Sequence, residues 1–74
     1  MTKSTLDRTS NCTLIAEKYI CGKFQMGSGE VFFLEWDKVV PVVREAKVGD
    51  RFDVKLLRND DGGVRAIVKA EAVT

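Results

Sequence analysis

A small all-β domain without a long helix is the fold class that the sequence predicts. Short segments rich in β-branched and aromatic residues alternate with turns that contain glycine, asparagine or aspartate. No segment places apolar residues at every third and fourth position over the length of a long amphipathic helix. Four or five short strands in a chain of 74 residues favour a closed or nearly closed barrel, because closure removes the unpaired edges of a small sheet.

The N-terminal strands are predicted from β-branched and aromatic content. Thr13–Cys21 is expected to be one strand that ends at Gly22, and Lys23–Met26 continues it toward a turn. The turn is Gly27–Gly29, where glycine allows the chain to reverse. Glu30–Trp36 is the most apolar run and is predicted to be a strand buried largely on both faces.

The C-terminal half is predicted to hold one short helix and a hairpin. Pro41–Lys47 is the best helical candidate, although its β-branched residues weaken it. Val48–Asp50 is expected to be a turn, and Asn59–Gly63 is the strongest hairpin signal in the chain. On the strand before that hairpin turn, Phe52, Val54 and Leu56 are expected on one face, and Arg51, Asp53 and Lys55 on the other. After the turn, the apolar Val64, Ala66, Val68 and Ala70 are expected to alternate with Arg65, Ile67, Lys69 and Glu71.

Composition places the chain among small folded proteins. It is 45% apolar and 31% charged with a net charge of +1, so full disorder and nucleic-acid coating by charge alone are both disfavoured. It has neither an apolar run long enough to span a membrane nor an export signal, which predicts a cytoplasmic protein that does not enter the membrane. Residues 1–10 are predicted to be a flexible polar lead-in, and residues 11–74 a single barrel domain.

The sequence predicts neither catalysis nor a bound metal or cofactor. It lacks histidine and has two cysteines, fewer ligands than a zinc site needs. Cys12 and Cys21 are interpreted as small buried hydrophobes rather than as a disulfide, since cytosol is reducing. No histidine is available to activate a thiol, so the protein is not expected to be an enzyme.

Residues 22–74 resemble a degenerate cold-shock domain, the smallest of the OB-type five-stranded barrels. Gly22-Lys23-Phe24 falls where the first motif of that family ends, and Val31-Phe32-Phe33-Leu34 falls on its second motif. Gly49 to Val54 resembles its fourth strand, and Gly63 to Val73 its fifth. Leu34 stands where the family has a histidine, and Glu35 where it has a phenylalanine. The resemblance implies a five-stranded barrel more than it implies the family's activity.

Aromatic residues on the apolar run are the candidates for base stacking. OB-type barrels bind single strands on exposed aromatics, with cations on the backbone. Phe32, Leu34 and Trp36 share one face of their strand, and Val31, Phe33 and Glu35 share the other. If Val31 and Phe33 point inward, Phe32 and Trp36 form an outer platform. The alternative is that these rings simply form the core. The predicted stacking residues are Phe24, Phe32 and Trp36, and the predicted phosphate contacts are Lys23, Lys55, Arg65 and Lys69.

Two functions therefore stand as hypotheses. The first is a module that binds single-stranded nucleic acid, RNA rather than DNA, in a chaperone-like or regulatory role. The second is a protein-interaction or self-assembling barrel, such as an accessory protein of a mobile element. Its contact surface, shared with a homo-oligomer or another protein, would be Val39, Val40, Val42 and Val43 together with Phe32 and Trp36.

Overall fold

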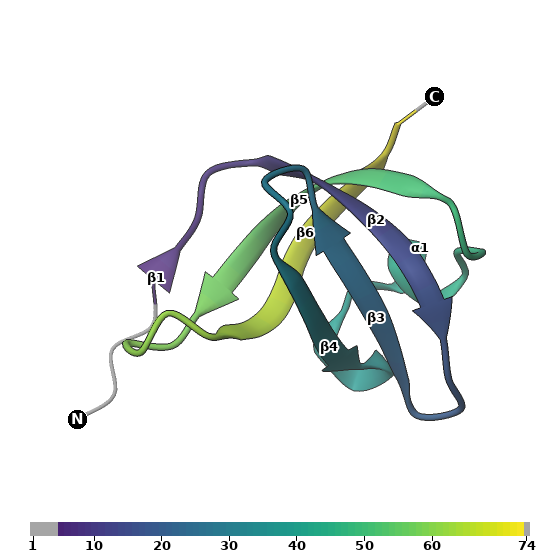
Figure 1. The fold of residues 1–74 in the computed structure, drawn as a ribbon, viewed down its shortest axis with the longest axis horizontal. Coiled ribbons are helices and arrows are strands. Elements are labelled where there is room, and N and C mark those ends of the chain that lie inside the picture. The colour runs from purple at the N-terminus through teal and green to yellow at the C-terminus, as the bar shows by residue number, and fades with distance from the viewer. Residues whose placement is uncertain (1–4, 74) are drawn as a thin grey trace.

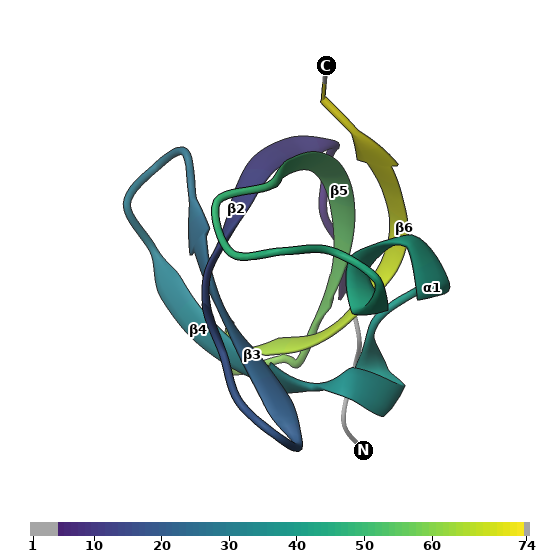
Figure 2. The ribbon, with the colours of Figure 1, turned by 90° about the vertical axis from the view of Figure 1, so that its right-hand side faces the viewer.

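The computed structural model describes residues 5–73 as one curled antiparallel sheet with two short helical segments (Figures 1 and 2). The strands are β1 (Thr5–Leu6), β2 (Ser10–Glu17), β3 (Cys21–Met26), β4 (Val31–Glu35), β5 (Arg51–Arg58) and β6 (Val64–Ala72). Between β4 and β5 lie a 3-10 helix, η1 (Trp36–Lys38), and a single helical turn, α1 (Pro41–Arg44). The prediction of a mostly β protein without a long helix is confirmed for these residues.

The sheet curls into a half-barrel around its core. Its strand order is β1-β5-β2-β3-β4, with β6 outside this order and paired with β5. β1 and β2 pair with different parts of one edge of β5, and β6 pairs along its other edge. Every pairing is antiparallel. Among the described residues, β4 and β6 share no ladder, although they approach each other at the side where η1 and α1 also meet β6. Figure 2 shows the strands curving around a common interior with α1 at one side.

The core is apolar and collects one face of each long strand. β5 contributes Phe52, Val54 and Leu56, as its alternating sequence predicts. The other buried side chains are Cys12, Leu14, Phe24, Met26, Leu34, Val39, Val43 and Ile67. Because Val39 and Val43 are core residues and Val40 packs against the core, the valine run around α1 covers the interior. The contact surface predicted there is therefore wrong: Val42 is the exposed member of the four.

The segment predicted as one strand over Thr13–Cys21 is instead broken by a turn. β2 ends at Glu17 and β3 begins at Cys21. The turn is closed by the Lys18 N–H, which donates to the Cys21 carbonyl at 2.9 Å, and the Trp36 N–H donates to the Ile20 carbonyl. No glycine, proline or asparagine marks this turn, so the sequence carried no local signal for it.

The alternation predicted for β6 is also interrupted. Ile67 is buried, whereas Val68 is exposed. The register between β5 and β6 shifts between Lys55 and Leu56 and again between Leu57 and Arg58. A bulge inserts one residue on one strand and reverses the face that follows it. Ile67 therefore enters the core in place of Val68.

The remaining predicted segments agree with the structure in part. The turns at 27–29 and 48–50 form, with Gly29 and Gly49 at φ of +99° and +100°, a backbone region that glycine enters without strain. Within the segment predicted as a flexible lead-in, Thr5 and Leu6 pair with β5 and Ser10 begins β2; residues 1–4 lie outside the described part. Across residues 5–73 the helices are too short to cross a membrane.

Candidate functional site

The face of β4 that points to solvent carries Val31 and Phe33. An outer platform of Phe32 and Trp36 would need the other face to be exposed. Leu34 is buried, and Phe32 is half-buried against the core. Phe33 is 54% exposed and Val31 is 44% exposed. The platform of Phe32 and Trp36 is therefore wrong, and the outward-facing ring of this strand is Phe33.

The pairing of β4 with β3 explains this orientation. In β3, Phe24 and Met26 alternate with Lys23 and Gln25, so the apolar pair must face the core. The turn at Gly27–Gly29, closed by the Met26 N–H donating to the Glu30 carbonyl, aligns Phe24 with Phe32. Directly opposed residues in an antiparallel pair lie on the same face of the sheet.

Phe24 is part of the packed interior, and Trp36 is partly buried against the core. Phe24 has 0% exposure, stacks on Phe32 at 5.5 Å between centroids, and meets the edge of Trp36 at 6.4 Å. The predicted role of Phe24 in base stacking is therefore wrong, because no face of its ring reaches solvent. Trp36 is half-buried, and its indole N–H donates to the Lys18 carbonyl at 2.9 Å.

The outer face of β3 and β4 carries an aromatic ring with a cation above it. Lys23 pairs with Phe33 across the two strands, and its ammonium lies 5.6 Å from the centroid of the Phe33 ring. A cation at this distance from an aromatic face is attracted by the ring. The next pair is Gln25 with Val31. We call these four residues, Lys23, Gln25, Val31 and Phe33, the Phe33 face.

Two exposed side chains stand at the end of the β2–β3 hairpin. Tyr19 is 97% exposed, and Ile20 is also exposed. Beside them lies an open groove lined by Glu17, Lys18, Tyr19, Trp36 and Arg44. The turn that exposes Tyr19 was not predicted, because the sequence indicated one continuous strand there.

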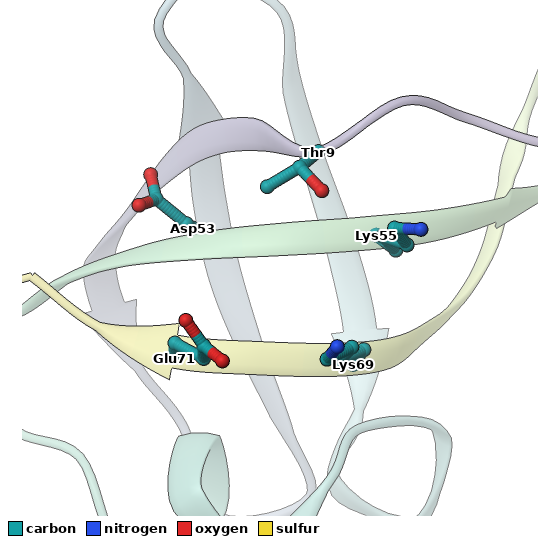
Figure 3. Close-up of a pocket in the computed structure, with 5 residues that line it drawn as sticks. All are labelled: Thr9, Asp53, Lys55, Lys69 and Glu71. Carbon is teal, nitrogen blue, oxygen red and sulfur yellow. The ribbon is translucent and has the colours of Figure 1, made fainter.

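The other predicted phosphate contacts lie on different strands from Lys23. Lys55 and Lys69 face each other across β5 and β6, and β2 separates β5 from β3 in the sheet. Arg65 is exposed near the start of β6. Figure 3 shows Lys55 and Lys69 beside Asp53 and Glu71 around a small hollow that Thr9 completes. The structure therefore does not bring the four predicted cations together.

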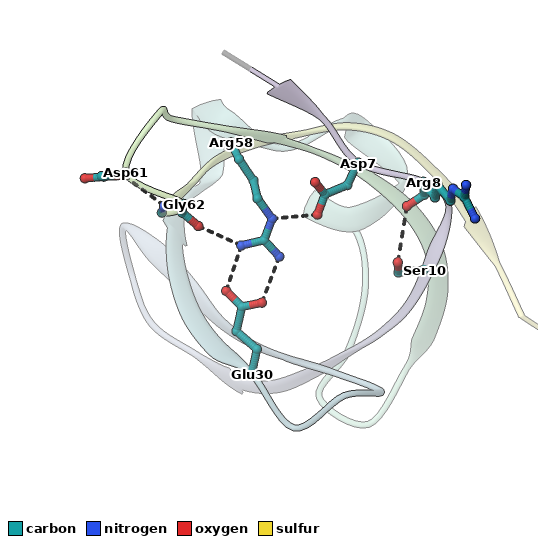
Figure 4. Close-up of polar contacts among 8 residues, drawn as sticks. Asp7, Arg8, Ser10, Glu30, Arg58, Asp61 and Gly62 are labelled. Atoms are coloured by element: carbon teal, nitrogen blue, oxygen red, sulfur yellow. Dashed lines mark hydrogen bonds and ion pairs between the residues drawn. The ribbon is translucent and has the colours of Figure 1, made fainter. Parts of the chain in front are cut away.

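Arg58 holds three segments together at one end of the half-barrel (Figure 4). Its guanidinium donates two hydrogen bonds to the Glu30 carboxylate, at 2.9 and 2.7 Å, one to Asp7 and one to the Gly62 carbonyl. The hydrogen bonds from Arg58 hold the pKa of Glu30 below its ordinary value. This cluster uses its donors and acceptors internally, which is the arrangement of a structural tie.

The Cys12 thiol is buried in the core. Burial raises the pKa of the Cys12 thiol to about 11, which keeps it protonated and unreactive at neutral pH. Within residues 5–73, no group of three or more acidic or cysteine side chains is placed to hold a metal ion.

Comparison with known proteins finds no matching family model, curated protein or solved structure.

Proposed function

We propose that the protein binds single-stranded nucleic acid on the Phe33 face. The observation that carries the proposal is the Phe33 ring, which is 54% exposed on the outer face of β3 and β4, with the Lys23 ammonium 5.6 Å from its centroid. A base stacked on such a ring gains about 1–3 kcal/mol. A base that stacks on this ring would displace the Lys23 ammonium, which could then contact a phosphate of the same strand.

The order of strand pairing supports an OB-type barrel. If β1 is set aside, β2, β3 and β4 form a meander, β5 pairs with β2, and β6 pairs with β5. The short helical segments lie between β4 and β5. In OB-type barrels, oligonucleotides bind on the second and third strands and on the loop between the first two. Here those elements are β3, β4 and the turn that carries Tyr19.

The charge balance sets the expected strength of binding. The net charge is +1. On the outer face, the pair next to Lys23 and Phe33 contains the acidic Glu35. Few phosphates can be neutralised, so stacking rather than counterion release would provide most of the affinity. We therefore propose micromolar or weaker binding with a shallow dependence on salt. We propose RNA rather than DNA as the target, and parallel titrations with the two kinds of oligonucleotide distinguish them.

The test is a titration of isotope-labelled protein with short oligouridine and, separately, oligodeoxythymidine. Binding is monitored by the changes in amide chemical shifts. The largest shifts are expected at Lys23, Gln25, Phe33 and the turn around Tyr19. Phe33→Ala should weaken binding by about fivefold to a hundredfold, the loss expected for one stacked base. Tyr19→Ala should weaken it less.

Val68→Ala is the matched control, because Val68 is a similarly exposed apolar residue on β6. It should bind as the wild type does. Shifts confined to β5 and β6, or an unchanged spectrum at millimolar oligonucleotide, would contradict the proposal.

A further inference from the structure

The outer face of β5 and β6 carries two like-charged pairs in succession. Asp53 lies directly opposite Glu71, and Lys55 lies directly opposite Lys69. Figure 3 shows the two carboxylates at one end of this patch and the two ammonium groups at the other. We call these four residues the charge quartet.

Within a single molecule the quartet places like charges directly opposite each other. Like charges directly opposite each other across two strands destabilise a sheet, whereas opposite charges stabilise it. Among the described residues, none of the four side chains forms an ion pair within 4.0 Å. The lysines and carboxylates thus lie on one face, close to groups of opposite charge, without being paired with them.

The same pattern is self-complementary under a two-fold rotation. The axis lies in the plane of contact between two copies of this face. It runs across β5 and β6 and passes midway between the acidic pair and the lysine pair. Rotation about it turns the face of a second copy toward the first and reverses the strand direction. Asp53 then faces Lys55 of the second copy, and Glu71 faces Lys69. In such an isologous contact each interaction occurs twice, once on either side of the axis.

We propose that the charge quartet is the centre of a symmetric dimer of this chain. The occupant is a second copy, because one rotation satisfies all four charges of both molecules with no other partner. Val68 and Val73 are exposed on or beside the same strand and extend the contact with apolar area. Exposed ion pairs contribute little each, so the dimer is weak and salt-sensitive.

This dimer goes beyond nucleic-acid binding and does not depend on it. It uses β5 and β6, whereas the Phe33 face lies on β3 and β4, with β2 between the two regions of the sheet. Both surfaces can therefore be occupied at once. Self-assembly was predicted to use the valine run, which is largely buried. The charge quartet provides an exposed surface for it instead.

Sedimentation equilibrium of the wild-type protein is the first measurement. A monomer–dimer equilibrium is expected, with a dissociation constant that rises about tenfold or more between about 20 mM and 300 mM NaCl, as screening shortens the range of the charges. In a concentration series of amide spectra, the shifts should centre on Thr9, the charge quartet and Val68. A wild-type monomer at millimolar concentration in low salt would overturn the proposal.

Charge reversal gives the decisive test. The double variants Lys55→Glu/Lys69→Glu and Asp53→Lys/Glu71→Lys each carry four like charges on the face and should be monomeric. An equimolar mixture of the two should form a heterodimer at least as readily as the wild type forms its dimer. A mixture that stays monomeric, or a single variant that still dimerises, would show that the quartet is not the interface.

Lys38→Glu/Lys47→Glu is the control, because it changes the net charge as Lys55→Glu/Lys69→Glu does but at exposed sites outside β5 and β6. It should dimerise like the wild type. Circular dichroism of each variant establishes that it is folded. If a reversal variant does not fold, the location of the concentration-dependent shifts in the wild type decides the question.

Discussion

Gly22 determines how closely Trp36 can pack against β3. A Cβ atom at this position would lie 2.7 Å from Cη2 of Trp36 and 3.0 Å from Cζ of Phe24. Both neighbours are constrained, since the Trp36 indole is hydrogen-bonded to Lys18 and Phe24 is fully buried. Glycine is therefore required here because of a close approach between a strand and a ring, and not because of its backbone angles.

We expect Gly22→Ala to destabilise the protein by about 1–3 kcal/mol, the usual cost of overpacking. It should also shift the emission of Trp36, because the indole must move away from β3. Denaturant unfolding followed by tryptophan fluorescence measures both effects. Gly27→Ala is the matched control, since its Cβ would lie 3.7 Å from the nearest atom. Equal stability of the two variants would contradict the packing argument.

At the scale of an element, β4 divides its side chains between the core and the surface. We expect Leu34→Ala to cost about 2–5 kcal/mol of unfolding free energy, because it leaves a cavity at a buried site. Phe33→Ala should cost about 1 kcal/mol or less, mainly the loss of the contact with Lys23. Urea unfolding of both variants tests the assignment of faces. A larger loss for Phe33→Ala than for Leu34→Ala would mean that the faces are reversed.

At the scale of the whole molecule, Arg58 ties together Asp7, the start of β4 and the β5–β6 turn (Figure 4). The pKa of Glu30 is lower in the folded protein than in the unfolded chain, because Arg58 hydrogen-bonds its ionised form. Its contribution to stability is therefore full above the ordinary glutamate pKa of about 4.3. The contribution is lost as the pH falls through the lowered value.

Replacing Glu30 with glutamine should lower stability at neutral pH by about 1 kcal/mol or less, as for other exposed ion pairs. The difference from the wild type should vanish at acidic pH, where the wild-type carboxylate is protonated. Thermal unfolding over a pH series measures this convergence. Glu45→Gln, at an exposed carboxylate outside the cluster, should leave the profile unchanged. A difference that persists at low pH would show that Glu30 acts through packing rather than charge.

Part of the candidate site could be read from the sequence. The position of Lys23 on an exposed face follows from β3 itself, where polar and apolar residues alternate. Phe33 could not be assigned from its own strand, since Val31 to Leu34 places large apolar side chains on both faces. The missing information was the register, which aligns Phe32 with the buried Phe24. The alternation in β3 together with the Gly27–Gly29 turn contains the information that sets this register.

The sequence by itself determined the features that depend on neighbouring residues: the glycine turns, the alternation of β5, the short helix after Pro41 and the mostly β class. The tertiary structure alone decided which rings are buried, where β2 and β3 separate, and how bulges direct Ile67 inward. Turn formation and alternation are set by local backbone sterics and side-chain period. Which side of a strand is buried, and the register of that strand, depend on pairing with strands distant in sequence. A shift of one residue in that pairing exchanges the buried and exposed sides.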